Sequence, residues 1–164
     1  AFRDNWNGSE ETDITVGAYH VLELDTDGTK QAEHFINAVG EDLSGRLIPA
    51  VEVRLRGLYK LLPPDYYEAA DNLADFCDRI EEQYGVRPVI YCTERTYKNI
   101  VASDSRFNKD KIWYESLFSK PDEDMDWTFW TYTNRVKFSF YESGEYLHMA
   151  VFNGSEDDFK KLIM

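Results

Sequence analysis

The chain contains no apolar run of the roughly 20 residues that a membrane-spanning helix needs. It is also short of positive charge: 18 basic residues face 31 acidic ones, and the net charge of −13 argues against binding nucleic acid or an anionic membrane surface through bulk charge. The first residues show no basic segment followed by an apolar one, so we expect any export signal to lie outside this sequence. Aromatic residues make up 15% of the chain, which indicates a folded globular protein because disordered acidic chains are poor in aromatics.

Cysteine is scarce as well. Cys77 falls in a helical pattern and Cys92 in an apolar, strand-like one, with no CxxC spacing, so we expect two buried free thiols. No metal is predicted, because no His or carboxylate cluster has ligand spacing. The segment 25–28 resembles the opening of a calcium loop but lacks the glutamate at the twelfth position, so it is interpreted as a turn. No cofactor is predicted either, since phosphate-binding glycine loops are absent.

Apolar β-rich segments alternate with amphipathic ones, which is typical of an α/β fold built from βα units. The 164 residues show no internal repeat or linker, and they predict a single domain spanning 1–164. The predicted strands span 14–22, 47–55, 87–92, 112–117, 127–133 and 147–152. The predicted helices span 31–39, 65–84 and 95–102, and a last helix begins at Ser155, whose capping-box partner is Asp158.

The strand predicted over 47–55 carries two charged residues near its end. Glu52 and Arg54 are two positions apart, so their side chains point to the same face of the strand. In an α/β barrel this face lines the interior, and the carboxyl ends of the strands form the floor of the active site. Glu52 and Arg54 are therefore the first candidates for a functional site.

Six short motifs occur along the chain in an order and spacing that resemble the glycoside hydrolase family 25 lysozymes, muramidases that cleave the glycan chains of peptidoglycan. They are 16–20 (VGAYH), 31–35 (QAEHF), 49–53 (PAVEV), 85–91 (GVRPVIY), 129–133 (FWTYT) and 151–155 (VFNGS). The resemblance implies a TIM-like irregular (β/α) barrel of five βα units followed by three strands. The segment 2–6 (FRDNW) resembles the stretch that enters the third strand of that barrel. We therefore expect the first two strands to be missing from this chain, and the domain 1–164 to be incomplete at its N-terminus.

The resemblance also implies where catalytic residues belong. The family has a D-x-E pattern at the end of its fourth strand, one further Asp on its first strand and another on its last. Here the D-x-E pattern falls on Glu52 and Arg54, and His148 occupies the last-strand position. A guanidinium cannot serve as a proton donor near neutral pH. Glu52 is thus the one catalytic carboxylate that the resemblance retains, and the resemblance implies lost or reduced hydrolase activity.

Three functions remain open. In the first, the domain is a degenerate lysozyme relative in which Glu52 and Arg54 form a salt bridge. In the second, it is a working muramidase with Glu52 as the acid, assisted by His148 or His20. In the third, it has a different activity or is a protein interaction module that uses the acidic segments 122–124 and 156–158.

A glycan-binding role rests on aromatic residues that the resemblance places along a sugar groove: Tyr19, Tyr91, Trp113, Trp130 and Tyr132. The implied partner is peptidoglycan or a related glycan, and the implied location is secreted or cell-wall associated, of bacterial or phage type. An incomplete barrel also leaves an open sheet edge, which favours self-association.

Overall fold

The computed structural model describes residues 2–138 and 146–164. Its strands are β1 (Tyr19–Val21), β2 (Ala50–Val53), β3 (Val89–Thr93), β4 (Ile112–Glu115), β5 (Phe129–Val136) and β6 (Leu147–Phe152). Its helices are α1 (Phe2–Gly8), α2 (Gly28–Val39), α3 (Tyr66–Tyr84), α4 (Glu94–Thr96) and α5 (Glu156–Lys160). Short turns are η1 (Ser9–Glu11), η2 (Gly57–Lys60), η3 (Tyr97–Val101) and η4 (Ser105–Phe107). None of the helices in these residues has the length and apolarity to cross a membrane.

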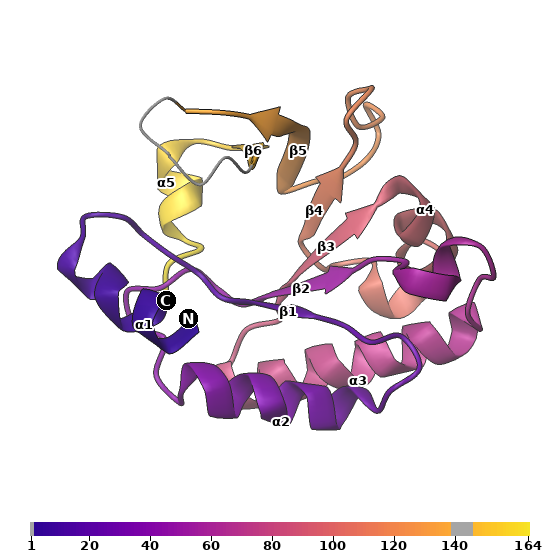
Figure 1. Cartoon of the computed structure of the whole chain (residues 1–164), viewed down its shortest axis with the longest axis horizontal. Coiled ribbons are helices and arrows are strands. Elements are labelled where there is room, and N and C mark those ends of the chain that lie inside the picture. The colour runs from indigo at the N-terminus through magenta and orange to yellow at the C-terminus, as the bar shows by residue number, and fades with distance from the viewer. Residues whose placement is uncertain (1, 139–145) are drawn as a thin grey trace.

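All the described strands belong to one sheet, in the order β1-β2-β3-β4-β5-β6. Strands β1 to β5 are parallel, and β6 pairs with β5 in the antiparallel direction. The sheet curls from β1 and β2, beside the long helices, round to β5 and β6 near α5 (Figure 1). The result is a half-barrel, which confirms the predicted α/β fold of barrel type.

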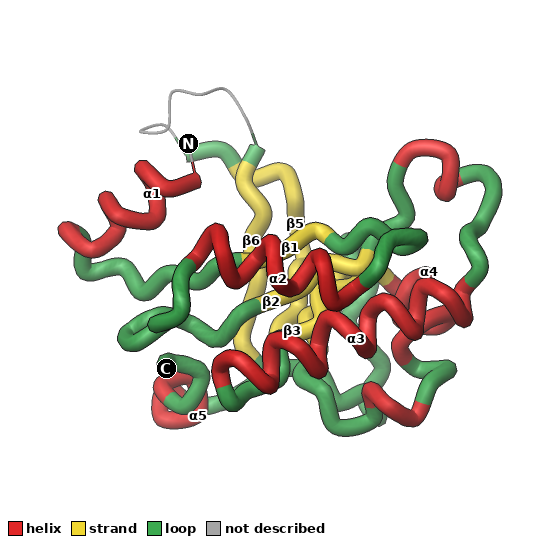
Figure 2. The backbone as a smooth tube through the Cα atoms, turned by 90° about the horizontal axis from the view of Figure 1, so that it is seen from below, coloured by secondary structure: helices red, strands yellow, loops and turns green. Residues whose placement is uncertain are grey.

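Helices α2 and α3 lie side by side and cover one face of the sheet, here called the outer face (Figures 1 and 2). Asp65 caps α3 by accepting hydrogen bonds from the N–H groups of Tyr67 and Glu68, and Gly85 ends the helix in the left-handed conformation. Gly28 lets α2 approach α3 closely, because a Cβ atom at this position would lie 1.8 Å from the backbone carbonyl oxygen of Asn72. The paired helices therefore form a fixed layer behind the sheet.

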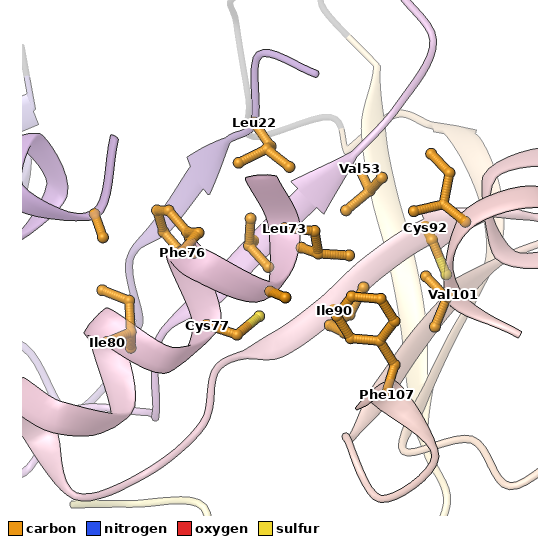
Figure 3. Close-up of a cluster of buried hydrophobic side chains, with 14 of the residues drawn as sticks. Leu22, Val53, Leu73, Phe76, Cys77, Ile80, Ile90, Cys92, Val101 and Phe107 are labelled. Atoms are coloured by element: carbon orange, nitrogen blue, oxygen red, sulfur yellow. The ribbon is translucent and has the colours of Figure 1, made fainter. Parts of the chain in front are cut away.

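The main hydrophobic core fills the space between this helical layer and the outer face of the sheet. The apolar stripe of α3 meets alternate residues of β2 and β3 there (Figure 3). Cys77 and Cys92 lie in this core as free thiols, as predicted, and burial raises the pKa of both. Its most deeply buried members include Val51, Val53, Leu73, Phe76, Ile80, Ile90 and Ile100.

A second, smaller cluster fills the opposite face of the sheet, here called the inner face, near the amino ends of the strands. The rings of Trp113, Phe129, Phe152 and Phe159 pack against one another with centroids 5.3 to 6.5 Å apart, beside the buried Leu162. Apolar side chains thus occupy the inner face at one end. The other end, where the parallel strands finish, is left for polar residues.

The predicted elements differ from the observed ones mainly at their ends. The strand predicted over 14–22 is ordered as a strand only from Tyr19 to Val21, and the one predicted over 47–55 only from Ala50 to Val53. Leu47 pairs instead with Ile163 in an isolated antiparallel bridge. The helix predicted over 95–102 is divided between α4 and the π-helical turn η3. The capping box of Ser155 and Asp158 is confirmed.

Helix α1 was not predicted, because the segment 2–6 was interpreted as the entry to a strand. The rings of Phe2 and Trp6 stack with centroids 5.7 Å apart, and this i,i+4 pair favours the helical conformation. The guanidinium carbon of Arg46 lies 4.3 Å from the centroid of the Trp6 ring, and Arg46 also donates hydrogen bonds to the Trp6 carbonyl and the Ser9 hydroxyl. A residue 40 positions away therefore holds α1 in place.

Candidate functional site

The register of the parallel strands gathers polar side chains on the inner face. Glu52 of β2 lies opposite Val21 of β1 and Tyr91 of β3, and Tyr91 lies opposite Trp113 of β4. Glu115 follows two residues after Trp113, so its side chain points to the same face. The strands thus bring carboxylates and an aromatic side chain together near their carboxyl ends, where barrel enzymes carry their active sites.

Arg54 lies at the centre of this group and holds both carboxylates. Its Nε donates to Glu52 Oε1 at 2.5 Å, while Nη1 and Nη2 donate to the two oxygens of Glu115 at 2.9 and 2.7 Å. Nη2 also donates to the Tyr91 hydroxyl oxygen at 3.2 Å, and the Tyr91 hydroxyl donates in turn to Glu115. The second oxygen of Glu52 accepts a hydrogen bond from Arg56 Nη2 at 2.8 Å. The predicted salt bridge between Glu52 and Arg54 is therefore confirmed, as part of a five-residue network.

This network is largely withdrawn from solvent. The side chains of Glu52 and Glu115 are 7% and 8% exposed, against 27% for Arg54 and 53% for Arg56. Burial by itself would raise the pKa of Glu115, but hydrogen bonds from Arg54 and Tyr91 outweigh it and the pKa is lowered. The hydrogen bond to Glu115 raises the pKa of Arg54, while burial and the Glu115 contact raise that of Tyr91.

The protonation states that follow are unsuited to general acid catalysis. A glycosidase acid needs a carboxyl group that stays protonated near neutral pH, which burial away from cations provides. Glu115 is instead held as a carboxylate by a bidentate guanidinium. Arg54 stays charged throughout the physiological range, because its pKa is raised further from an already high value. The network is a set of paired charges that can accept and donate hydrogen bonds.

The sequence motifs do not point to Glu115, although it accepts more hydrogen bonds from Arg54 than Glu52 does. The available signal was a single charged residue in the apolar segment 112–117, on the same strand face as Trp113. What the sequence alone could not give was the pairing of β2 with β3 and of β3 with β4, which brings residues 61 positions apart into contact.

Three of the five predicted sugar-binding aromatics lie on the inner face. The rings of Tyr91 and Trp113 have centroids 4.8 Å apart, and the Trp113 indole N–H donates to the hydroxyl of Thr131 at 2.8 Å. Tyr19 is opposite Ala50 at the β1 edge, and its side chain is 60% exposed. Tyr91 is therefore part of the Arg54 network and Trp113 packs against it, while Tyr19 is exposed to solvent on the same face.

The other two, Trp130 and Tyr132, are placed differently. Trp130 is opposite Tyr114 in the sheet, and both pack against the main core on the outer side. The Trp130 indole donates to the carbonyl oxygen of Ser116 at 2.9 Å, and its ring meets that of Tyr132 edge to face. These two residues do not share a face with Glu52, since alternation along β5 turns Phe129 and Thr131 toward the inner side instead.

The two histidines considered as assistants also lie apart from each other. His20 points to the outer face, where its ring stacks on Phe76 and its Nε2 lies 3.0 Å from Gln31 Oε1. Burial lowers the pKa of His20. This position is on the opposite side of the sheet from Glu52, so His20 cannot assist it. His148 is exposed on β6, and its charge interaction with Glu115 lowers the pKa of that carboxylate less than the contacts of Arg54 and Tyr91 do.

Two small cavities flank Arg54. One, of about 210 Å³, is lined by residues of the β1 end and η2, including Glu23, Arg56 and Tyr59. The other, of about 250 Å³, is lined by Arg54, Leu55, Lys60, Thr93 and Arg95. A larger apolar cavity of about 460 Å³ lies between α1 and β1, and its lining includes Tyr19 and Val21. The network thus lies between open spaces that a ligand could enter.

The family model for glycosyl hydrolases family 25 matches residues 1–139, most of the chain. A solved family 25 glycosyl hydrolase from Bacillus anthracis is 31% identical, with a TM-score of 0.86 over 99% of this chain and 75% of that one. The chain belongs to glycosyl hydrolase family 25. A bacterial lysozyme from Streptomyces coelicolor has the same fold, with a TM-score of 0.80 and 23% identity over 98% of this chain and 77% of that one.

The family assignment predicted from the six motifs is thereby confirmed, together with its lysozyme-like fold. Among curated proteins, the uncharacterized protein YegX of Escherichia coli O157:H7 is 29% identical over 165 residues. That match covers 99% of this chain and 57% of YegX, so the chain spans little more than half the length of this relative. In this chain Arg54 pairs with two carboxylates, Glu52 and Glu115.

Proposed function

We propose that this family 25 domain binds peptidoglycan or a related glycan on its inner face without hydrolysing it. The observation that carries the proposal is the engagement of Arg54 with both nearby carboxylates. Glycoside hydrolysis requires one carboxylic acid to protonate the leaving oxygen and a second carboxylate to stabilise or attack the sugar. Arg54 holds Glu115 in the ionised form and occupies one oxygen of Glu52, so neither group is poised as the acid.

Several features of the same face suit a sugar ligand. Tyr19, Tyr91 and Trp113 offer aromatic surface, on which the apolar face of a pyranose ring can pack. The partly exposed guanidinium groups of Arg54 and Arg56 and the Tyr91 hydroxyl are hydrogen-bonding partners for sugar hydroxyls. A ligand of this kind places the domain at a cell wall. We therefore assign glycan binding to the inner face rather than to the outer one, which is packed against helices.

The test combines hydrolysis with binding. Purified protein is incubated with peptidoglycan while turbidity and released reducing ends are followed, and calorimetry measures binding of muropeptides and chitooligosaccharides. We expect no hydrolysis above the protein-free blank, and saturable binding that weakens on Tyr19→Ala. The matched control is Tyr132→Ala, which removes a tyrosine that is also exposed but does not share a face with Glu52.

The outcomes separate the alternative functions. Measurable hydrolysis that disappears on Glu52→Gln would refute the proposal in favour of an active muramidase. Failure of every glycan to bind the folded protein would favour a protein interaction module. Equal weakening by Tyr19→Ala and Tyr132→Ala would remove the assignment to the inner face.

A further inference from the structure

The cavity of about 250 Å³ beside Arg54 is lined by three basic side chains, and not all of them are paired with a carboxylate. Arg54 is neutralised within the network, where Glu52 and Glu115 together face Arg54 and Arg56. Lys60 and Arg95, which also line this cavity, have no carboxylate within 4 Å among the residues that the structure describes. Two cationic groups are therefore left over at its rim.

A hydrogen bond brings the Arg95 guanidinium next to the backbone of Lys60. The Nη1 group of Arg95 donates to the backbone carbonyl of Lys60 at 3.4 Å, which links α4 to η2 across the cavity. The nearest acidic neighbour along α4, Glu94, is already paired with Lys98 at 2.6 Å. In the cavity on the other side of Arg54, by contrast, Glu23 contributes to the lining and Asp25 accepts a hydrogen bond from Tyr59.

This local excess is notable in a chain whose net charge is −13, because the overall field repels anions from most of the surface. We propose that Lys60 and Arg95 form a subsite for an anionic oxygen group, a carboxylate of peptidoglycan, held beside the glycan that lies on the inner face. The proposal rests on the glycan-binding function given above. Peptidoglycan carries such carboxylates on its peptide stems, whereas chitooligosaccharides carry none, so the subsite would distinguish the two ligands.

The test compares ligands that differ only in charge. A muropeptide with free carboxylates and the same muropeptide with its carboxylates amidated are titrated into the protein by calorimetry. We expect the free form to bind on the order of tenfold more tightly at low salt, and the difference to shrink as sodium chloride is raised. In the double variant Lys60→Gln/Arg95→Gln this difference should disappear, while binding of the amidated form stays unchanged.

The matched control is Lys98→Gln, which removes a cation near the cavity that is already paired with Glu94. Preference for the free form should persist in this variant. If wild-type protein binds both forms equally, the subsite is refuted while glycan binding stands. If the double variant keeps the preference, Lys60 and Arg95 are not its source and the proposal is likewise overturned.

A second measurement keeps the subsite testable if no glycan binds. Acetate and inorganic phosphate are titrated separately while NMR follows the amide signals of Leu55 and Thr93, which line the cavity. Saturable shifts with acetate in the wild type that vanish in Lys60→Gln/Arg95→Gln support a carboxylate subsite. Saturation by phosphate alone, or no saturation by either anion, overturns it.

Discussion

Replacing Arg54 with methionine tests the central interaction of the site. The change leaves Glu115, 8% exposed, without its cation, although the Tyr91 hydroxyl still donates to it. Removing one partner of a buried ion pair lowers the free energy of unfolding by about 3–5 kcal/mol. Because Glu115 keeps its contact with Tyr91 and because Arg54 is 27% exposed, we expect a loss at the lower end, about 3 kcal/mol at pH 7. In a chain of 164 residues this loss lowers Tm by roughly 6–12 °C.

The cause of that loss is identified by a double-mutant cycle. If the cost of Arg54→Met is the uncompensated charge on Glu115, then adding Glu115→Gln should recover about 2 kcal/mol relative to the sum of the single variants. Arg54→Met alone should also regain stability as the pH falls from 7 to 5. Without Arg54, burial raises the folded-state pKa of Glu115, so the folded protein binds a proton more readily than the unfolded chain.

The assay is urea unfolding followed by tryptophan fluorescence, at pH 7 and at pH 5. Arg56→Met is the control, because Arg56 is 53% exposed and, among the residues that the structure describes, pairs with Glu52 alone, so its loss should cost less than about 1 kcal/mol. The reasoning is refuted if Arg54→Met costs no more than Arg56→Met. It is also refuted if the Arg54 and Glu115 substitutions simply add.

Three further changes test the fold and the charge state. Gly28→Ala should cost roughly 2–3 kcal/mol in urea unfolding, because its Cβ meets the Asn72 carbonyl oxygen, while Gly8→Ala, with open space around it, should change little. Asp65→Ala removes the cap of α3 and should lower stability by about 1 kcal/mol in the same assay; an unchanged midpoint would contradict the capping role. The folded-state pKa of Glu115 is lower than its pKa of 4.5 in the unfolded chain. The ionised carboxylate therefore stabilises the fold above pH 4.5, and this stabilisation is lost as the pH falls through the folded-state pKa. The stability difference between wild type and Glu115→Gln, measured between pH 7 and 3, should therefore shrink only below about pH 4.5, and a constant difference would contradict this.

Much of the fold could be predicted from local pattern. The apolar stripe over 66–84, with Asp65 before it and Gly85 after it, is a local pattern that is sufficient to predict α3. The alternation of Glu52 with buried valines likewise fixes which face of β2 is polar. These features depend on residues close in sequence, where helical and strand periodicity act directly.

What could not be predicted depends on contacts between distant residues. Helix α1 is held by Arg46, and no feature of the segment 2–6 shows that contact. The separation of Trp130 from Trp113 follows from the alternation of β5 combined with its pairing to β4. Both residues occur in short aromatic segments that predict strands, and only the register assigns them to opposite faces.

The pairing of Arg54 with Glu115 explains how the inner face accommodates a cation at the position where the resemblance implies an acid. A lone buried guanidinium beside Glu52 and Arg56 would leave an excess positive charge on the inner face, at a considerable desolvation cost. Glu115 supplies the missing negative charge and a bidentate geometry that suits arginine better than lysine. The two residues therefore act as a unit. A carboxylate placed at position 54 would lie beside two others, Glu52 and Glu115, and the repulsion among them would keep one of the three protonated to a higher pH.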